Sequence, residues 1–198
     1  AKLGEEDLAH LYYTLLLKDI GCSSNAARIC ELYLADDLTF KRDVKSVGDS
    51  LPQILRFVLA HTGLKAGMTE RFRSLLAIVT QGGQISRELI ETRCQRGADI
   101  ARRMRFPEEV AGGILDLDEH WDGKGKPMNV EGSKISVFAR IALIAQVVDV
   151  FNMGDGREAA LREVRERSGA WFDPMLVEAF ERAAARPAFW KVLGSTDL

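Results

Sequence analysis

Histidine and cysteine are scarce in this chain of 198 residues, and both shortages limit its chemistry. The three histidines restrict which metal centres the chain can build, because imidazole is a common ligand for transition metals. The three cysteines form no Cys-x-x-Cys pair, and their odd number favours reduced thiols. A fold stapled by disulfides is therefore not expected.

An excess of one charge and a long uninterrupted apolar run are also missing. The chain has 27 Lys plus Arg against 29 Asp plus Glu, a balance that gives no support to a general binder of nucleic acid or membrane surfaces. The longest apolar stretch, residues 137–151, is interrupted by Arg140, Gln146 and Asp149, and we interpret it as too polar to span a bilayer. The first residues lack the basic and apolar segments of a secretory signal. We therefore expect a cytoplasmic protein without a nucleic-acid or membrane partner.

Helical periodicity dominates the sequence, and no alternating pattern is long enough to predict a pair of strands. We therefore expect an all-α, multi-helix bundle forming a single domain over residues 1–198, and the absence of an initial Met fits a fragment of a longer protein. One predicted helix carries an apolar face made of Leu8, Leu11, Tyr12, Leu15 and Leu16. Other helices are predicted from Ser23 or Ser24, around residues 52–59 and 69–80, from Ser86 to about Met104 with an inward seam of Ile90, Cys94, Gly97, Ala101 and Met104, from Pro107, from about Ser136, after Gly156, and from the Asp173-Pro174 cap.

Three segments carry a resemblance to a known family. They are the Gly- and Pro-rich loop at residues 121–127, the sequence Ala-Arg-Ile at residues 139–141 after Ile135, and residues 169–174. In this order and spacing they resemble the HD-GYP subset of the HD-domain phosphohydrolases. That family consists of all-α, metal-dependent phosphodiesterases acting on cyclic di-GMP. The resemblance extends from about Leu8 to Phe180 and implies an HD-domain-like bundle.

The chain departs from the family at most positions that the resemblance assigns to metal ligands. A divalent metal centre needs several imidazole or carboxylate ligands, and a lysine or arginine among them repels the metal. The resemblance places Lys18-Asp19 at the family's His-Asp pair, Arg93 at a family histidine, residues 117–119 at a His-His-Glu sequence, and Gln146 and Asp149 at two aspartates.

We expect Lys18 or Arg93 to form an ion pair with Asp19 or Asp118 where the family holds metal, and we expect no metal cofactor. The resulting hypothesis is a degenerate HD-GYP-like signalling domain that binds a cyclic dinucleotide or a partner signalling protein without metal-dependent hydrolysis. A homodimer is its candidate assembly. The alternative is a phosphohydrolase that hydrolyses cyclic di-GMP with Fe or Mn at a rearranged site. The ligands of that site would be Asp19, Asp118, Glu119 and His120.

The loop after His120 is the candidate ligand-binding segment. Its backbone N–H groups could cradle a phosphate beside two lysines, or it could be a structural turn in which glycines supply positive φ. Trp121 could stack on a base or anchor the core. The candidate catalytic residues are Lys18 and Asp19, and the candidate ligand-binding residues are Arg93, Trp121, Asp122, Gly123, Lys124, Gly125 and Lys126.

Overall fold

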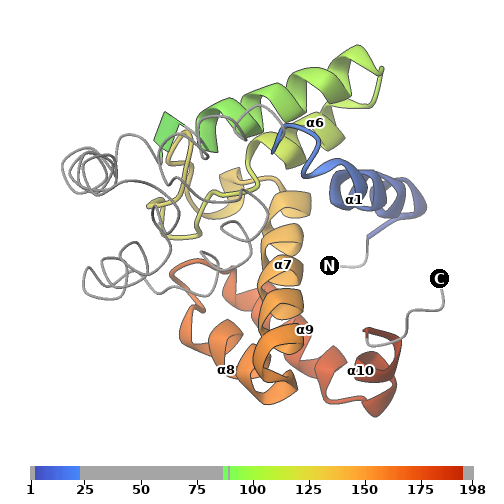
Figure 1. Ribbon diagram of the computed structural model, residues 1–198, viewed down its shortest axis with the longest axis vertical. Coiled ribbons are helices and arrows are strands. Elements are labelled where there is room, and N and C mark those ends of the chain that lie inside the picture. The colour runs from blue at the N-terminus through green and yellow to red at the C-terminus, as the bar shows by residue number, and fades with distance from the viewer. Residues whose placement is uncertain (1–2, 23–86, 89, 194–198) are drawn as a thin grey trace, which may run out of the picture.

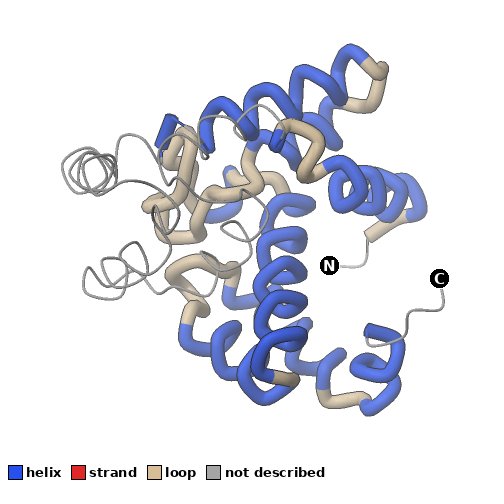
Figure 2. The backbone as a smooth tube through the Cα atoms, viewed as in Figure 1, coloured by secondary structure: helices blue, strands red, loops and turns tan. Residues whose placement is uncertain are grey.

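The structure, a computed structural model, describes residues 3–22, 87–88 and 90–193, and there the chain is helical (Figures 1 and 2). The all-α prediction is confirmed, since the described residues contain no strand and only one isolated bridge, between Ser168 and Phe172. The helices predicted from Ser23 or Ser24, over 52–59 and over 69–80 lie outside the described residues. The described elements are α1 (Glu5–Leu17), a helix over residues 87–88 and 90–103, α6 (Glu108–Leu115), the 3-10 turn η2 (Gly132–Lys134), α7 (Val137–Asp155), α8 (Arg157–Glu166), α9 (Pro174–Ala184) and α10 (Pro187–Leu193).

Helix α7 runs through the middle of the described fold and contacts α1, α6, α8 and α9 (Figure 1). Among the described helices it alone is long and apolar enough, by length and composition, to cross a membrane. Our interpretation that this stretch is too polar to do so was therefore too strict. Nearly half of that stretch is buried inside the molecule, as in the core helix of a globular domain.

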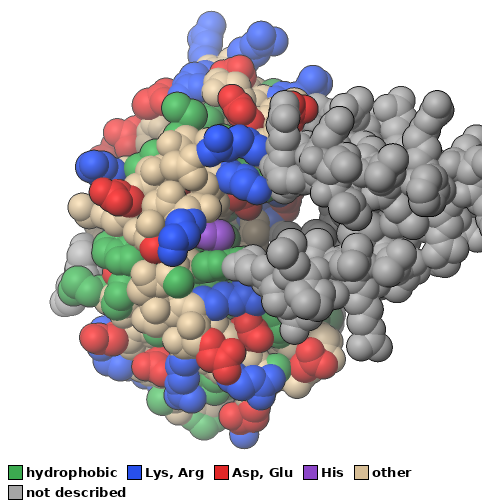
Figure 3. All heavy atoms as spheres, turned by 90° about the vertical axis from the view of Figure 1, so that its left-hand side faces the viewer, with side chains coloured by type: hydrophobic (Ala, Val, Ile, Leu, Met, Phe, Trp, Pro, Cys, Tyr) green, Lys and Arg blue, Asp and Glu red, His purple; other side chains and the backbone are tan. Residues whose placement is uncertain are grey.

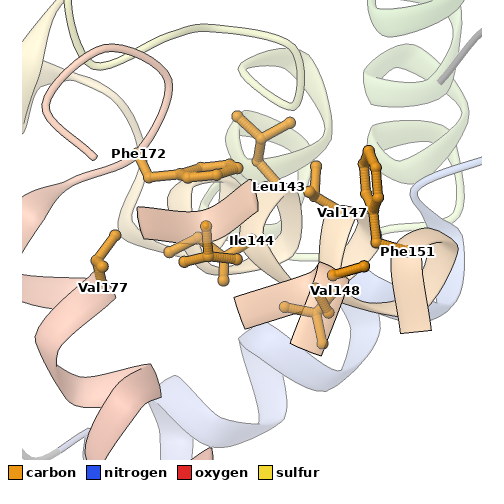
Figure 4. Close-up of a cluster of buried hydrophobic side chains, with 10 residues drawn as sticks. Leu143, Ile144, Val147, Val148, Phe151, Phe172 and Val177 are labelled. Atoms are coloured by element: carbon orange, nitrogen blue, oxygen red, sulfur yellow. The ribbon is translucent and has the colours of Figure 1, made fainter. Parts of the chain in front are cut away.

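One hydrophobic cluster lies where α7 meets α8 and α9 (Figure 4). Phe172 is 1% exposed and packs here, together with buried alanines and valines of the two later helices. The predicted cap of α9 is confirmed, because an Asp173 carboxylate oxygen accepts a hydrogen bond from Met175 N at 2.9 Å and Pro174 follows in the first turn. The labelled members of the cluster are Leu143, Ile144, Val147, Val148, Phe151, Phe172 and Val177.

A second cluster joins the helix ending at residue 103 to α6, through Ala98, Ala101, Val110, Ala111 and Ile114. The predicted seam is confirmed at Cys94, Gly97 and Ala101, which are buried. It is wrong at Met104, which is 54% exposed, because the helix has already ended and Arg105 takes a positive φ. Small side chains therefore set a short distance between these two helices.

The predicted apolar face of α1 is only partly covered in the fold. Leu8, Tyr12 and Leu16 are 53%, 61% and 63% exposed, whereas Leu11 and Leu15 are half-buried. The side of α1 that packs inward carries Thr14, which is fully buried against Gly113 of α6. Because a glycine opposite a threonine permits closer backbone approach than two leucines would, the helix docks through its small residues.

Candidate functional site

The turn after α1 brings Lys18 and Asp19 together. The Lys18 ammonium forms an ion pair with Asp19 Oδ2, and the side chains are 23% and 52% exposed. Asp19 Oδ1 accepts a hydrogen bond from the Cys22 thiol at 3.6 Å. Between them, Gly21 lies against the backbone of Arg93 and Gly97, where a Cβ would come within 3.0 Å of backbone atoms. This close approach fixes the turn beside the helix that carries Arg93.

Arg93 and Asp118 form the second ion pair of the site, with side chains 16% and 22% exposed. The same carboxylate oxygen, Asp118 Oδ2, accepts a hydrogen bond from the Cys94 thiol at 3.5 Å. Burial raises the pKa of Cys94, although Arg93 acts in the opposite direction, so the thiol stays protonated and donates. The sequence predicted an ion pair of Lys18 or Arg93 with Asp19 or Asp118, and the structure contains two such pairs.

Glu119 is 2% exposed, and its carboxylate is directed at the following loop. It accepts hydrogen bonds from Met128 N at 2.5 Å and from Val130 N at 3.0 Å. Burial raises the pKa of Glu119, and these backbone hydrogen bonds act against that rise. The carboxylate thus holds the loop in shape.

His120 and Trp121 attach the loop to residues 167–173. The His120 ring stacks on Trp171 at 4.3 Å between centroids, and the Arg167 guanidinium lies 4.2 Å from the centroid of Trp171. Trp121 N donates to Trp171 O at 3.1 Å. The Trp121 ring is half-buried and lies 5.6 Å from the guanidinium of Arg140, within the range of a cation–π contact.

Arg140 itself is held by a buried carboxylate. Its Nη1 lies 2.6 Å from Asp173 Oδ2, and its Nε donates to Ile135 O at 3.1 Å. The sequence predicted Asp173 only as a helix cap, whereas its second oxygen also binds this arginine. Arg140 and Asp173 are 33 residues apart, and a single sequence gives no signal of contact over such a separation, so the pair was missed.

The loop at residues 122–127 is organised mainly by its own contacts. Asp122 accepts from Lys124 N at 3.1 Å and from Lys124 Nζ at 2.9 Å. Burial raises the pKa of Asp122, but the hydrogen bonds and charge of Lys124 outweigh it, and the pKa is lowered. Gly123 has φ +74°, and Gly125 lies so close to the backbone of Glu119 that it leaves no room for a Cβ.

Three backbone N–H groups of this loop donate within the chain, which bears on the predicted phosphate cradle. Gly123 N donates to His120 O, Lys124 N to Asp122, and Lys126 N to Asp118 O. A phosphate at this loop would therefore meet the lysine side chains rather than these three amides. The surface that includes the loop carries Lys and Arg side chains interspersed with Asp and Glu (Figure 3).

The candidate ligands for a rearranged metal site are not brought together. Within residues 3–22, 87–88 and 90–193, no three His, Cys, Asp or Glu side chains converge to hold a metal ion. Asp19 and Asp118 are each paired with a cation, and His120 is stacked on Trp171. Gln146 is buried and carries no charge, while Asp149 is exposed on α7. The described residues do not fit the metal centre of an HD-domain phosphohydrolase.

Comparison with known proteins identifies the relatives of this chain. Residues 49–176 match the HD domain family. The whole chain is 53% identical, over 197 residues, to the 3'3'-cGAMP-specific phosphodiesterase 3 of Vibrio cholerae, of which it covers 43%. It is 32% identical over 83 residues, 39% of this chain and 16% of the relative, to a cyclic di-GMP phosphodiesterase of the same species.

A solved structure gives the same result. The crystal structure of a cyclic GMP-AMP specific phosphodiesterase of V. cholerae has a TM-score of 0.70 and 45% sequence identity. The match covers 99% of this chain and 42% of that chain. The chain thus spans less than half the length of the relative that it matches from end to end.

These comparisons correct two predictions. The hypothesis of a module that binds without hydrolysis is wrong, because the relative that matches the whole chain is a phosphodiesterase. The expectation of no metal cofactor is also wrong, because kinship with HD-domain phosphodiesterases implies a divalent metal. Both predictions had rested on the ligand positions that are substituted in this chain.

Proposed function

Because this chain belongs to the HD domain family, we propose that it works as part of a metal-dependent phosphodiesterase that hydrolyses a cyclic dinucleotide. The observation that carries the proposal is the 53% identity, over all of this chain, to a 3'3'-cGAMP-specific phosphodiesterase. We therefore propose 3'3'-cGAMP as the first candidate substrate. Cyclic di-GMP is the second, on the strength of the shorter match to a phosphodiesterase for that dinucleotide.

The proposed reaction adds water across one phosphodiester of the ring. The phosphorus–oxygen bond to one ribose breaks, the ribose oxygen takes up a proton, and a linear dinucleotide with a terminal phosphate is released. The described residues do not supply a metal centre for this step. Their proposed part is to bind and orient the anionic substrate.

Lys124 is the residue of the loop best placed to contact a phosphate. Its side chain is 82% exposed, and its ammonium is held by Asp122 at 2.9 Å, which limits how widely it moves. An ammonium on a phosphate oxygen gives a charge-assisted hydrogen bond, among the stronger contacts available to a surface side chain. Lys126 and Arg93 remain proposed secondary contacts, whereas the Trp121 ring lies beside Arg140.

The remaining sequence-based expectations stay proposals. We place the protein in the cytoplasm and treat residues 1–198 as one domain. A homodimer and a signalling-protein partner also remain proposals. Lys18 and Asp19 are retained as candidate catalytic residues, and Asp19→Asn in the assay below decides whether they affect turnover.

The test is hydrolysis by the full-length protein. Purified protein is incubated with Mn²⁺ or Fe²⁺ and either 3'3'-cGAMP or cyclic di-GMP, and the products are separated by liquid chromatography. We expect a linear dinucleotide from 3'3'-cGAMP, with the higher kcat/KM of the two substrates. Folded protein that hydrolyses neither substrate would refute the proposal.

A lysine pair tests the part assigned to the loop. Lys124→Ala removes one charge-assisted hydrogen bond to phosphate, and we expect KM to rise about tenfold with little change in kcat. Lys191→Ala, which removes an exposed positive charge from α10, is the matched control and should leave KM unchanged. Equal effects of the two variants would show that only overall charge matters.

A further inference from the structure

We infer that Asp19 and Asp118 bind protein cations instead of a divalent metal, and that Arg93 forms a metal-free cross-link between its helix and the turn after α6. The resemblance to the HD-GYP proteins places both carboxylates at metal-binding positions. The inference concerns these two carboxylates alone and stands or falls separately from the proposed function.

Asp118 already has two protein partners at one carboxylate oxygen. Its Oδ2 is engaged by both Arg93 and the Cys94 thiol, and the two charged side chains are 16% and 22% exposed. A divalent ion that replaced the thiol would lie next to the guanidinium. The repulsion between charges of two and one is twice that of two unit charges, and the partly buried site screens it less than water does.

The backbone keeps Arg93 in this position. Its carbonyl lies against Gly21, so closely that a Cβ on residue 21 would overlap it. Cys94, the next residue, is 1% exposed and packs in the interior. The arginine therefore emerges from a fixed segment of helix, and its side chain reaches Asp118 across 25 residues of sequence. Metal ions often link distant segments of a chain by binding side chains from both of them. Here the guanidinium of Arg93 links its helix to the turn that carries Asp118.

Asp19, after the end of α1, is likewise paired with a protein cation at a position that the resemblance assigns to metal binding. Its Oδ2 is paired with Lys18, and its Oδ1 accepts from Cys22. Glu119, which follows Asp118 in sequence, accepts hydrogen bonds from Met128 N and Val130 N. In the described part of the chain no third ligand joins either aspartate.

The experiment measures metal binding and thermal stability of the purified protein. We expect Asp19→Asn and Asp118→Asn to leave the number of bound Mn²⁺ ions and their Kd within twofold of wild type, as measured by calorimetric titration. A tenfold or greater loss of Mn²⁺ affinity in either variant would overturn the inference. Asp19 is 52% exposed, so its variant tests metal binding without a large effect on folding.

Thermal unfolding with and without EDTA tests the cross-link. Arg93→Met keeps the aliphatic stem and leaves Asp118 without its cation, and we expect Tm to fall by several degrees both with and without EDTA. The double variant Arg93→Met/Asp118→Leu should recover most of that loss. If EDTA removes the difference between wild type and Arg93→Met, the cross-link depends on metal and the inference is wrong. Cyclic-dinucleotide hydrolysis, measured separately, does not enter either readout.

Discussion

Two neighbouring glycines of α6 should respond in opposite directions to the same substitution. A Cβ at Gly112 would meet nothing within 4 Å. A Cβ at Gly113 would lie 2.8 Å from Thr14 Cγ2, 2.9 Å from Thr14 Oγ1 and 3.3 Å from Phe138 Cβ. We therefore predict that Gly112→Ala stabilises the protein and that Gly113→Ala destabilises it.

The magnitudes follow from two effects. Alanine is favoured over glycine inside a helix by about 1 kcal/mol, and both variants gain this amount. At Gly113 the new methyl group is overpacked against a β-branched side chain with little rotational freedom and against a Cβ fixed to the backbone, which costs about 1–3 kcal/mol. Gly112→Ala should raise Tm by about 2–4 °C, whereas Gly113→Ala should lose up to about 2 kcal/mol.

Urea unfolding followed by circular dichroism measures both free energies of unfolding. The m-value should be the same for wild type and both variants, because the surface exposed on unfolding does not change. Thr14→Ala removes both atoms that a Cβ on Gly113 would meet most closely, so it should restore stability when combined with Gly113→Ala. If Gly113→Ala were as stabilising as Gly112→Ala, α1 would not pack on α6 through Thr14.

Three further predictions concern charge and burial. Burial raises the pKa of Asp116 above its ordinary 3.8, although the hydrogen bond from Ser136 N acts to lower it. The folded protein therefore binds this proton more tightly than the unfolded chain, and the stability of wild type relative to Asp116→Asn should fall as pH rises through the raised pKa. Urea unfolding at a series of pH values measures this difference. Cys94 should react with a maleimide far more slowly than Cys22, because the Cys94 thiol is buried and its pKa is raised. Peptide mass spectrometry measures the two rates separately, and equal rates would contradict the burial of Cys94. Arg140→Ala should cost about 3 kcal/mol of unfolding free energy because it leaves Asp173 buried without its cation, while Arg182→Ala, in an ion pair 70% exposed on both sides, should change stability by less than about 1 kcal/mol.

Much of the helical architecture could be predicted from periodicity and caps. The Asp173-Pro174 start of α9 and the buried seam around Cys94 follow from local rules, and the structure contains both. The face of α1 could not be predicted in the same way. A repeat of leucines identifies an apolar stripe, but it does not say whether the domain itself or something else covers it. The contact between Thr14 and Gly113 depends on two small residues 99 positions apart in sequence, which no periodicity reports.

The site shows a similar division. The cations at positions 18 and 93 allowed an ion pair with Asp19 or Asp118 to be predicted, although the sequence left open which cation meets which carboxylate. The role of Glu119 was not predictable, since its partners are backbone N–H groups whose direction depends on the loop. The functional conclusion failed for another reason. It rested on substituted ligand positions such as residues 18, 93 and 146, whereas the comparison that corrects it draws on the whole chain.

The two hydrophobic clusters described above have a consequence for how this sequence can vary. One cluster belongs to α7, α8 and α9, and the other to α6 and the helix ending at residue 103, and they share no residue. Substitutions in separate clusters should change stability additively, so each can be repacked over evolution without compensation in the other. Arg140 does not have this freedom, because it touches Trp121 of the loop and Asp173 at the start of α9 at once. A substitution of Arg140 would therefore disturb the loop and the start of α9 together.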